Sequence, residues 1–164
     1  MSYVRFAAMI IVSTVIMFAL MYLNTFALNH VFFSQTRAWM ALLMGAVMAA
    51  IMLIFMWNMY ANRNINSAIL AVSAGVFAIS LWLVRSQATV DDVSYMKAMI
   101  PHHSIAIMTS DRAHIHDPRV RKLADGIIAA QVKEIAEMKT LIEDLKEHPV
   151  SSNAPQIVPT VSPQ

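Results

Sequence analysis

The sequence predicts an all-α protein in which three transmembrane helices are followed by an antiparallel two-helix hairpin. Three long apolar runs occupy the first half of the chain. All ten Asp and Glu residues lie between Asp91 and Glu147, whereas the first ninety residues hold only four charged side chains. In the second half, apolar residues recur every three or four positions, which is the helical period. This division favours a membrane anchor followed by a polar helical domain.

The predicted transmembrane region covers residues 1–85, with spans at about 6–23, 38–60 and 68–84. Each run approaches the roughly 20 apolar residues that cross a bilayer core. Trp39, Trp57 and Trp82 lie near span ends, where interfacial aromatic residues belong. A cleaved signal peptide is the alternative for the first run. Because that run is long for a signal core and Tyr22-Leu-Asn-Thr is a poor cleavage site, we expect a retained span.

The arginines favour one membrane orientation by a small margin. With the N-terminus inside, Arg5 and Arg63 face the cytoplasm together with the amino group, while Arg37 and Arg85 face outward. This orientation predicts a multi-pass protein of the bacterial inner (cytoplasmic) membrane with a periplasmic or extracellular C-terminal domain. It also puts His30 on the same side as that domain.

Local end signals predict the hairpin, which we assign to residues 86–148. Thr89-Val-Asp-Asp92 has the pattern of a capping box, so a helix is expected to begin near Val90 and to end around His114 to His116. Asp117-Pro118 is typical of an N-cap followed by proline at the first helical position, and this second helix runs to about Glu147. Residues 149–164 are rich in proline and serine, which predicts a disordered tail.

The first hairpin helix carries the most informative segment, Met96-Lys-Ala-Met-Ile-Pro-His-His-Ser-Ile-Ala-Ile-Met108. It combines two adjacent imidazoles, His102 and His103, with thioether sulfurs. Nitrogen and soft sulfur suit Cu(I) better than metals that prefer oxygen. The chain has no cysteine, so disulfides and thiolate metal sites are excluded. Two neighbouring histidines also occur by chance, so the alternative is that one is a hydrogen-bonded core residue and the other is exposed to solvent.

An antiparallel hairpin that turns near His116 brings a second set of side chains to this segment. His103 is expected to face the neighbourhood of Gln131, Met99 that of Glu134, and Met96 that of Met138, with an error of about one turn. A buried glutamine needs a partner, which an imidazole or a bound metal would supply. The predicted metal site therefore contains His102, His103, Met99, Met138, Glu134 and Gln131. The alternative is that the methionines only fill the hydrophobic core.

These blocks also carry a family resemblance. Met-Ile-Pro-His-His-Ser-Ile-Ala-Ile, followed by Asp-Pro-Arg-Val-Arg-Lys-Leu-Ala and by Gln-x-x-Glu-Ile-x-x-Met, resembles domain-of-unknown-function family three-zero-five over about residues 91–145. The resemblance implies a ferritin-like helical bundle and copper association, on the same His, Gln, Glu and Met positions. Segments upstream resemble a membrane-anchored subgroup with three N-terminal spans. The polar half here has two helices, whereas longer soluble members have room for four.

A hairpin this short buries little core alone. We therefore expect a homo-oligomer in which two hairpins complete a ferritin-like four-helix bundle, the usual setting of metal sites in helical proteins. The leading functional expectation is a membrane-anchored protein that captures Cu(I) or Ag(I) for copper homeostasis or resistance. The alternatives are a non-catalytic oligomeric scaffold and a copper oxidase-like enzyme. We also expect contact with membrane lipid. We expect no nucleic-acid partner, because the net charge is only +2 and no basic stripe is present.

The second span holds a further pattern, a methionine at every fourth position from Met40 to Met56. Such a ridge is typical of helix packing. The alternative is a relay of thioethers that passes Cu(I) along the membrane.

Overall fold

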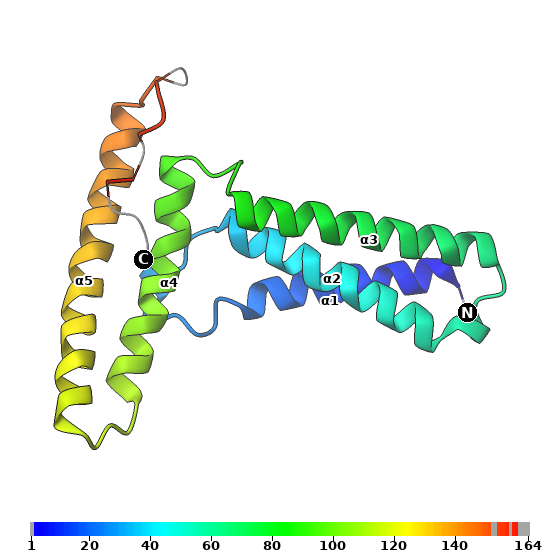
Figure 1. The fold of residues 1–164 in the computed structure, drawn as a ribbon, viewed down its shortest axis with the longest axis horizontal. Helices are drawn as coiled ribbons and strands as arrows, with labels where there is room; N and C mark the ends of the chain where they lie inside the picture. Colours follow the sequence, from blue (N-terminus) through cyan, green and yellow to red (C-terminus); the bar gives the residue numbers. More distant parts are fainter. Residues whose placement is uncertain (1, 152–153, 158, 161–164) are drawn as a thin grey trace.

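The computed structural model describes residues 2–151, 154–157 and 159–160, and within this part every regular element is helical. Three long helices run side by side: α1 (Tyr3–Leu20), α2 (Gln35–Phe55) and α3 (Arg63–Ser86). Two more, α4 (Asp92–Arg112) and α5 (Pro118–Glu147), form an antiparallel hairpin. Figure 1 shows this hairpin crosswise at one end of the three-helix region. The all-α prediction is confirmed.

All three N-terminal helices are long and apolar enough to cross a membrane. Their bounds differ from the expected spans because polar caps extend or shorten them. Asn62 accepts hydrogen bonds from the Asn64 and Ile65 amides, so α3 begins five positions before the apolar run does. α2 begins after Ser34 and stops at Phe55, and a 3-10 turn over Trp57–Met59 replaces the last part of the expected span.

Small residues let these helices approach closely. The buried positions of α2 are mostly alanine and glycine, and those of α3 are mainly small polar residues at seven-residue spacing. The α2 positions are Ala41, Gly45, Ala46, Ala49 and Leu53, and the α3 positions include Asn66, Ser73 and Ser80. Inside a lipid bilayer the hydrophobic effect does not drive helices together, because lipid tails are as apolar as the side chains. Close packing through small residues would therefore hold these three helices together.

Gly45 gives a first testable prediction. A Cβ at this position would collide with the Thr14 side chain of α1, because Thr14 Oγ1, Cγ2 and Cβ all lie against it. Gly45→Ala should therefore destabilise the α1–α2 contact by about 1–3 kcal/mol, the typical result of overpacking. The measurement is thermal unfolding of the full chain in detergent. Gly75→Ala is the matched control, since nothing lies within 4 Å of its Cβ, and it should leave the melting temperature unchanged or raised.

The hairpin helices begin at aspartates. Asp117 caps α5 through the Arg119 amide at 2.8 Å, with Pro118 at the first position, which confirms the expected start. α4 is capped by Asp91, which accepts from the Ser94 amide at 2.7 Å; the expected cap at Thr89 is wrong. α4 continues through Pro101 and ends at Arg112, before the expected His114. Of the expected disordered tail, residues 152–153, 158 and 161–164 lie outside the described residues, and the described remainder holds no helix.

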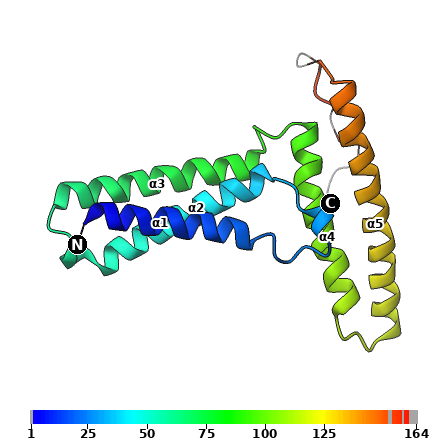
Figure 2. The same cartoon turned by 180° about the vertical axis from the view of Figure 1, so that it is seen from behind.

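Only one helix of the hairpin borders the three-helix region. α4 lies next to the end of the three-helix region and α5 lies on the far side of α4 (Figures 1 and 2). Figure 2 shows the segment between α1 and α2, with its 3-10 turn η1 (Leu28–His30), lying against α4. The two broad flanks of the hairpin therefore face sideways, across the long axis of the three-helix region.

Candidate functional site

α4 and α5 pack along a seam of buried apolar side chains. Its buried members are Met96, Ile100, Ile107, Ile135 and Ile142. Because successive helical residues are rotated by about 100°, the other α5 residues divide between the two flanks of this seam. Glu137, Leu141 and Asp144 lie on one flank, and Lys139 lies on the other. The first flank is open and the second is covered.

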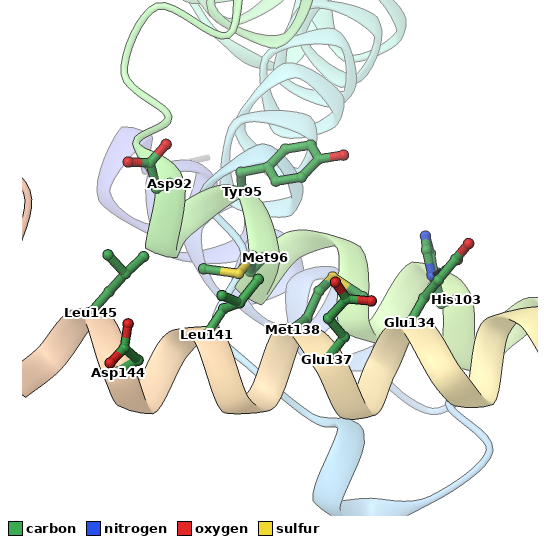
Figure 3. A pocket seen from close by; sticks show the side chains of 10 residues that line it. All are labelled: Asp92, Tyr95, Met96, His103, Glu134, Glu137, Met138, Leu141, Asp144 and Leu145. Atoms are coloured by element: carbon green, nitrogen blue, oxygen red, sulfur yellow. Dashed lines mark ion pairs between the residues drawn. The ribbon is translucent and has the colours of Figure 1, made fainter. Parts of the chain in front are cut away.

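The open flank forms a groove of about 580 Å³ between the two helices (Figure 3). Its lining residues are Asp92, Tyr95, Met96, His103, Glu134, Glu137, Met138, Leu141, Asp144 and Leu145. Four of these are carboxylates, and none of these lining residues is a lysine or arginine. The apolar floor and the acidic rim suit a cation that also has affinity for soft donors.

His103 lies at one end of the groove, beside Glu134 (Figure 3). Its Nδ1 atom lies 3.0 Å from Glu134 Oε2, and Gln131 Nε2 donates to the same carboxylate oxygen at 3.2 Å. The His103–Glu134 contact is an ion-pair distance without the geometry of a hydrogen bond, so the buried Nδ1 atom has no hydrogen-bond partner among the described residues. A buried ring nitrogen of this kind is a donor position for a ligand.

Burial also lowers the pKa of His103. The nearby Glu134 carboxylate opposes this shift, and the neighbouring His102 ring adds to it. The net result is an imidazole that stays neutral at lower pH than usual. A neutral ring is the form that binds a metal ion.

The structure brings some predicted site residues together and separates others. His103, Glu134 and Met138 line the groove, and Gln131 holds the Glu134 carboxylate from the neighbouring turn. His102 is exposed, and its ring centroid lies 6.2 Å from that of His103 at a tilt of 58°. Met99 is half-buried and is not among the lining residues. Met96, outside the predicted set, supplies the second thioether of the groove.

The groove is not a complete cage of hard ligands. Within the described part of the chain, no three His, Cys, Asp or Glu side chains come together as a metal site. A single chain offers one imidazole beside one carboxylate, at His103 and Glu134, and two thioethers, Met96 and Met138, further along the same groove. This donor set fits a soft monovalent ion better than Mg²⁺ or Ca²⁺, which need several oxygens.

The covered flank contains a contact that sequence reasoning did not foresee. The hydroxyl of Ser104, which is fully buried, accepts from the Phe26 amide at 2.8 Å and lies 3.0 Å from His30 Nδ1. Phe32 of the same loop packs against the hairpin core. The loop between α1 and α2 thus clamps α4 at the residue next to His103. Nothing in the local sequence around Ser104 signals a partner more than seventy positions away.

The pH dependence of this clamp is the second prediction. Ser104 of α4 and Lys139 of α5 face the His30 ring; burial lowers the pKa of His30, and Lys139 lowers it further. A neutral His30 can accept the Ser104 O–H at Nδ1, and protonation of the ring removes that acceptor. The undocked loop, with an imidazole pKa of about 6.5, takes up the proton more readily. Docking should therefore weaken as pH falls below about 6.5 and through the lowered pKa.

Hydrogen–deuterium exchange of the Phe26 amide checks this, expressed as a protection factor corrected for the intrinsic exchange rate at each pH. Protection should be high near neutral pH and should fall in acid. The variant His30→Gln removes the titrating group, so its protection should not change with pH. A wild-type protection factor that is equally constant would contradict the prediction.

The methionine ridge winds around α2. Met44, Met48 and Met52 line an apolar crevice of about 440 Å³ on α2 itself. Met52 and Met56 pack against the cluster that contains Ala49 and Leu53, at the end of the three-helix region opposite the hairpin. Both interpretations of the methionine pattern, a ridge for helix packing and a relay for Cu(I), stay predictions.

Comparison with known proteins supports the family resemblance of the hairpin. Residues 92–161 match the family model described as "Domain of unknown function (DUF305)". An uncharacterized protein of Acanthamoeba polyphaga mimivirus is 36% identical over 90 residues, which are 54% of this chain. The match covers 59% of the viral protein, so the chain spans about three fifths of that relative. No solved structure matches the chain significantly.

Proposed function

We propose that this chain, whose hairpin carries the family match, is a membrane-anchored metal-binding protein that captures Cu(I) or Ag(I) as cargo. The process served is copper homeostasis or resistance, and the groove faces the periplasmic or extracellular side of a bacterial inner membrane. One observation supports this most: the buried Nδ1 of His103, which has no hydrogen-bond partner among the described residues, lies beside Glu134 in an acidic groove that is also lined by two thioethers.

The donor types explain the choice of ion. Met96 and Met138 would supply soft sulfur and His103 would supply nitrogen, a combination that favours Cu(I) and Ag(I). Glu134, held by Gln131, would orient the imidazole or act as an oxygen ligand for Cu(II). The remaining carboxylates of the rim, Asp92, Glu137 and Asp144, would raise the local concentration of cations.

Two residues of the expected site take outer roles in this proposal. His102 is exposed one position before the groove ligand, where it would serve as a first contact for an arriving ion. Met99 is half-buried on the same helix and would pack beside the site. Neither position is required for the ion to be held in the groove.

A non-catalytic oligomeric scaffold is the second candidate function. The exposed apolar side chains of α5 favour it, since Leu123 is 65% and Leu141 is 44% exposed. A scaffold would use the same flank for protein contact and would have no affinity for soft ions. Both candidate functions therefore include association between protein chains, but only the first includes binding of a metal ion.

Metal binding by the full-length protein in mild detergent decides between them. The protein is purified without chelator, its metal content is measured, and Ag(I) and Cu(I) are titrated against a competing chelator under anaerobic conditions. We expect saturable binding of at most one soft ion per chain, and none of Mg²⁺ at the same concentration. Absence of saturable Ag(I) and Cu(I) binding would reject the capture function and leave the scaffold.

The orientation is tested separately. The chain has no cysteine, so Glu147→Cys introduces a single exposed thiol at the end of α5. A membrane-impermeant maleimide should label this thiol in intact spheroplasts. Labelling only after lysis would place the hairpin in the cytoplasm.

A further inference from the structure

We propose that the open flank of α5 docks on the same flank of a second copy of this chain, with the two α5 helices antiparallel. The second copy would close the groove and add its own His103 and Glu134 to the metal site. The shared metal site rests on the proposed function, whereas the docking surface does not. Each part has its own test.

The exposed flank of α5 has the spacing of a helix–helix interface. Steps of four and three residues alternate along it, which is the seam of a helical bundle. The seam contains Leu123, Ile127, Ala130, Glu134, Glu137, Leu141 and Asp144, all of which are exposed. The opposite flank is occupied by the loop at Ser104, so among the described residues this is the flank that borders the open groove.

The membrane fixes how a second copy can approach. Two copies inserted the same way round in one membrane are related by a two-fold axis along the membrane normal. The hairpin lies crosswise to the membrane helices and its open flank faces sideways (Figures 1 and 2). A two-fold rotation about the normal reverses any helix that lies in the membrane plane. The two α5 helices must therefore meet antiparallel.

The charges of α5 match this antiparallel arrangement. Arg119, which also pairs with Asp117, lies on this side at the start of the helix, and Glu137 and Asp144 lie on this side of the second half. Antiparallel docking brings Arg119 of one copy close to Asp144 of the other. Parallel docking would align like charges. Complementary ends of this kind favour one register and one partner orientation.

The same register determines what the second copy brings to the groove. If Leu123 faces Leu141 of the second copy, the two-fold axis passes midway, near position 132. Glu134 lies two residues from that point, so both Glu134 carboxylates and their His103 neighbours lie close to the axis. Ala130 is an exposed, small member of the seam near the same point and allows a close helix approach. The second copy thereby doubles the number of metal-binding side chains at the groove.

Cysteine crosslinking tests the docking surface, because the native chain has no cysteine background. Full-length Leu123→Cys and Leu141→Cys proteins with different tags are mixed in detergent and treated with a short bismaleimide. The mixture should crosslink, and each variant alone should not. Val132→Cys, exposed on the other flank, should fail to crosslink with Leu123→Cys. Crosslinking of Leu123→Cys to itself, or no crosslinking in the mixture, would overturn the antiparallel interface.

A crosslinked mixed dimer tests the shared site with Ag(I) as the probe. One chain carries His103→Ala together with Leu123→Cys, and the other carries only Leu141→Cys. A shared site predicts near-complete loss of Ag(I) binding, whereas two independent grooves would retain half. If the crosslinked dimer with both His103 residues intact binds no Ag(I), the capture function fails while the docking surface stands.

Discussion

Replacing His103 with alanine is expected to remove high-affinity Cu(I) and Ag(I) binding, whereas replacing His102 is expected to leave it nearly unchanged. The two residues are adjacent and chemically identical, so they form a matched pair. His103 presents a buried nitrogen to the groove, and His102 is exposed with its ring 6.2 Å away. Removing a mere outer-shell partner of a metal commonly costs about 10–100-fold in affinity, so loss of a direct ligand should cost at least about 100-fold.

The measurement is a competition titration of the full chain with Ag(I), supported by the circular dichroism of each variant. Met138→Leu keeps the volume of the side chain and removes the sulfur, so it should also weaken Ag(I) binding without changing helix content. Equal losses from His102→Ala and His103→Ala would contradict the groove as the binding site. They would point instead to a site on the exposed face of α4.

Replacing Ile100 with alanine should have the largest effect on stability. Ile100 is 0% exposed and lies in the middle of the seam with Met96, Ile107 and the α5 isoleucines. Truncating a buried isoleucine typically costs about 2–5 kcal/mol, because the removed atoms leave a cavity. A small hairpin has little stability in reserve. The hairpin of Ile100→Ala should therefore unfold well before the membrane helices do.

Hydrogen–deuterium exchange of the α4 and α5 amides in the full chain measures this loss directly. Val132→Ala is the control, since Val132 is 54% exposed and its replacement should change stability by less than about 0.5 kcal/mol. Similar protection in both variants would mean that the α4–α5 seam does not hold the hairpin together. In that case a partner chain or the membrane would have to supply the missing stability.

Local chemistry explains what could be predicted from the sequence. Asp117-Pro118 combines a cap and a fixed backbone angle within two residues, and the helix starts there as expected. Thr89 and Asp91 both satisfy the local cap pattern, and only the path of the chain from Gln87, which has a left-handed backbone, selects Asp91. The apolar pattern does not reveal the start of α3, because Arg63 and Asn64 are polar residues that lie within the helix.

Distant contacts explain what could not be predicted. The hairpin register came out one turn from the expected one: His103 meets Glu134, and Gln131 reaches that carboxylate from the turn before. The different surroundings of His102 and His103 follow from which side of α4 meets α5. The Ser104 contact joins residues 74 and 78 positions apart, and no periodicity within α4 reports it.

The loop at Ser104 has a consequence for how cargo could move. The hairpin is joined to the membrane helices by the chain at Gln87, by the Gln35–Ser94 hydrogen bond of 3.2 Å, and by the Phe26–Ser104 contact. Attachment at several separated points restrains the hairpin more than a single tether would. Under the proposed function, the groove would then stay at one height above the bilayer, and a donor or acceptor of the ion would have to come to it.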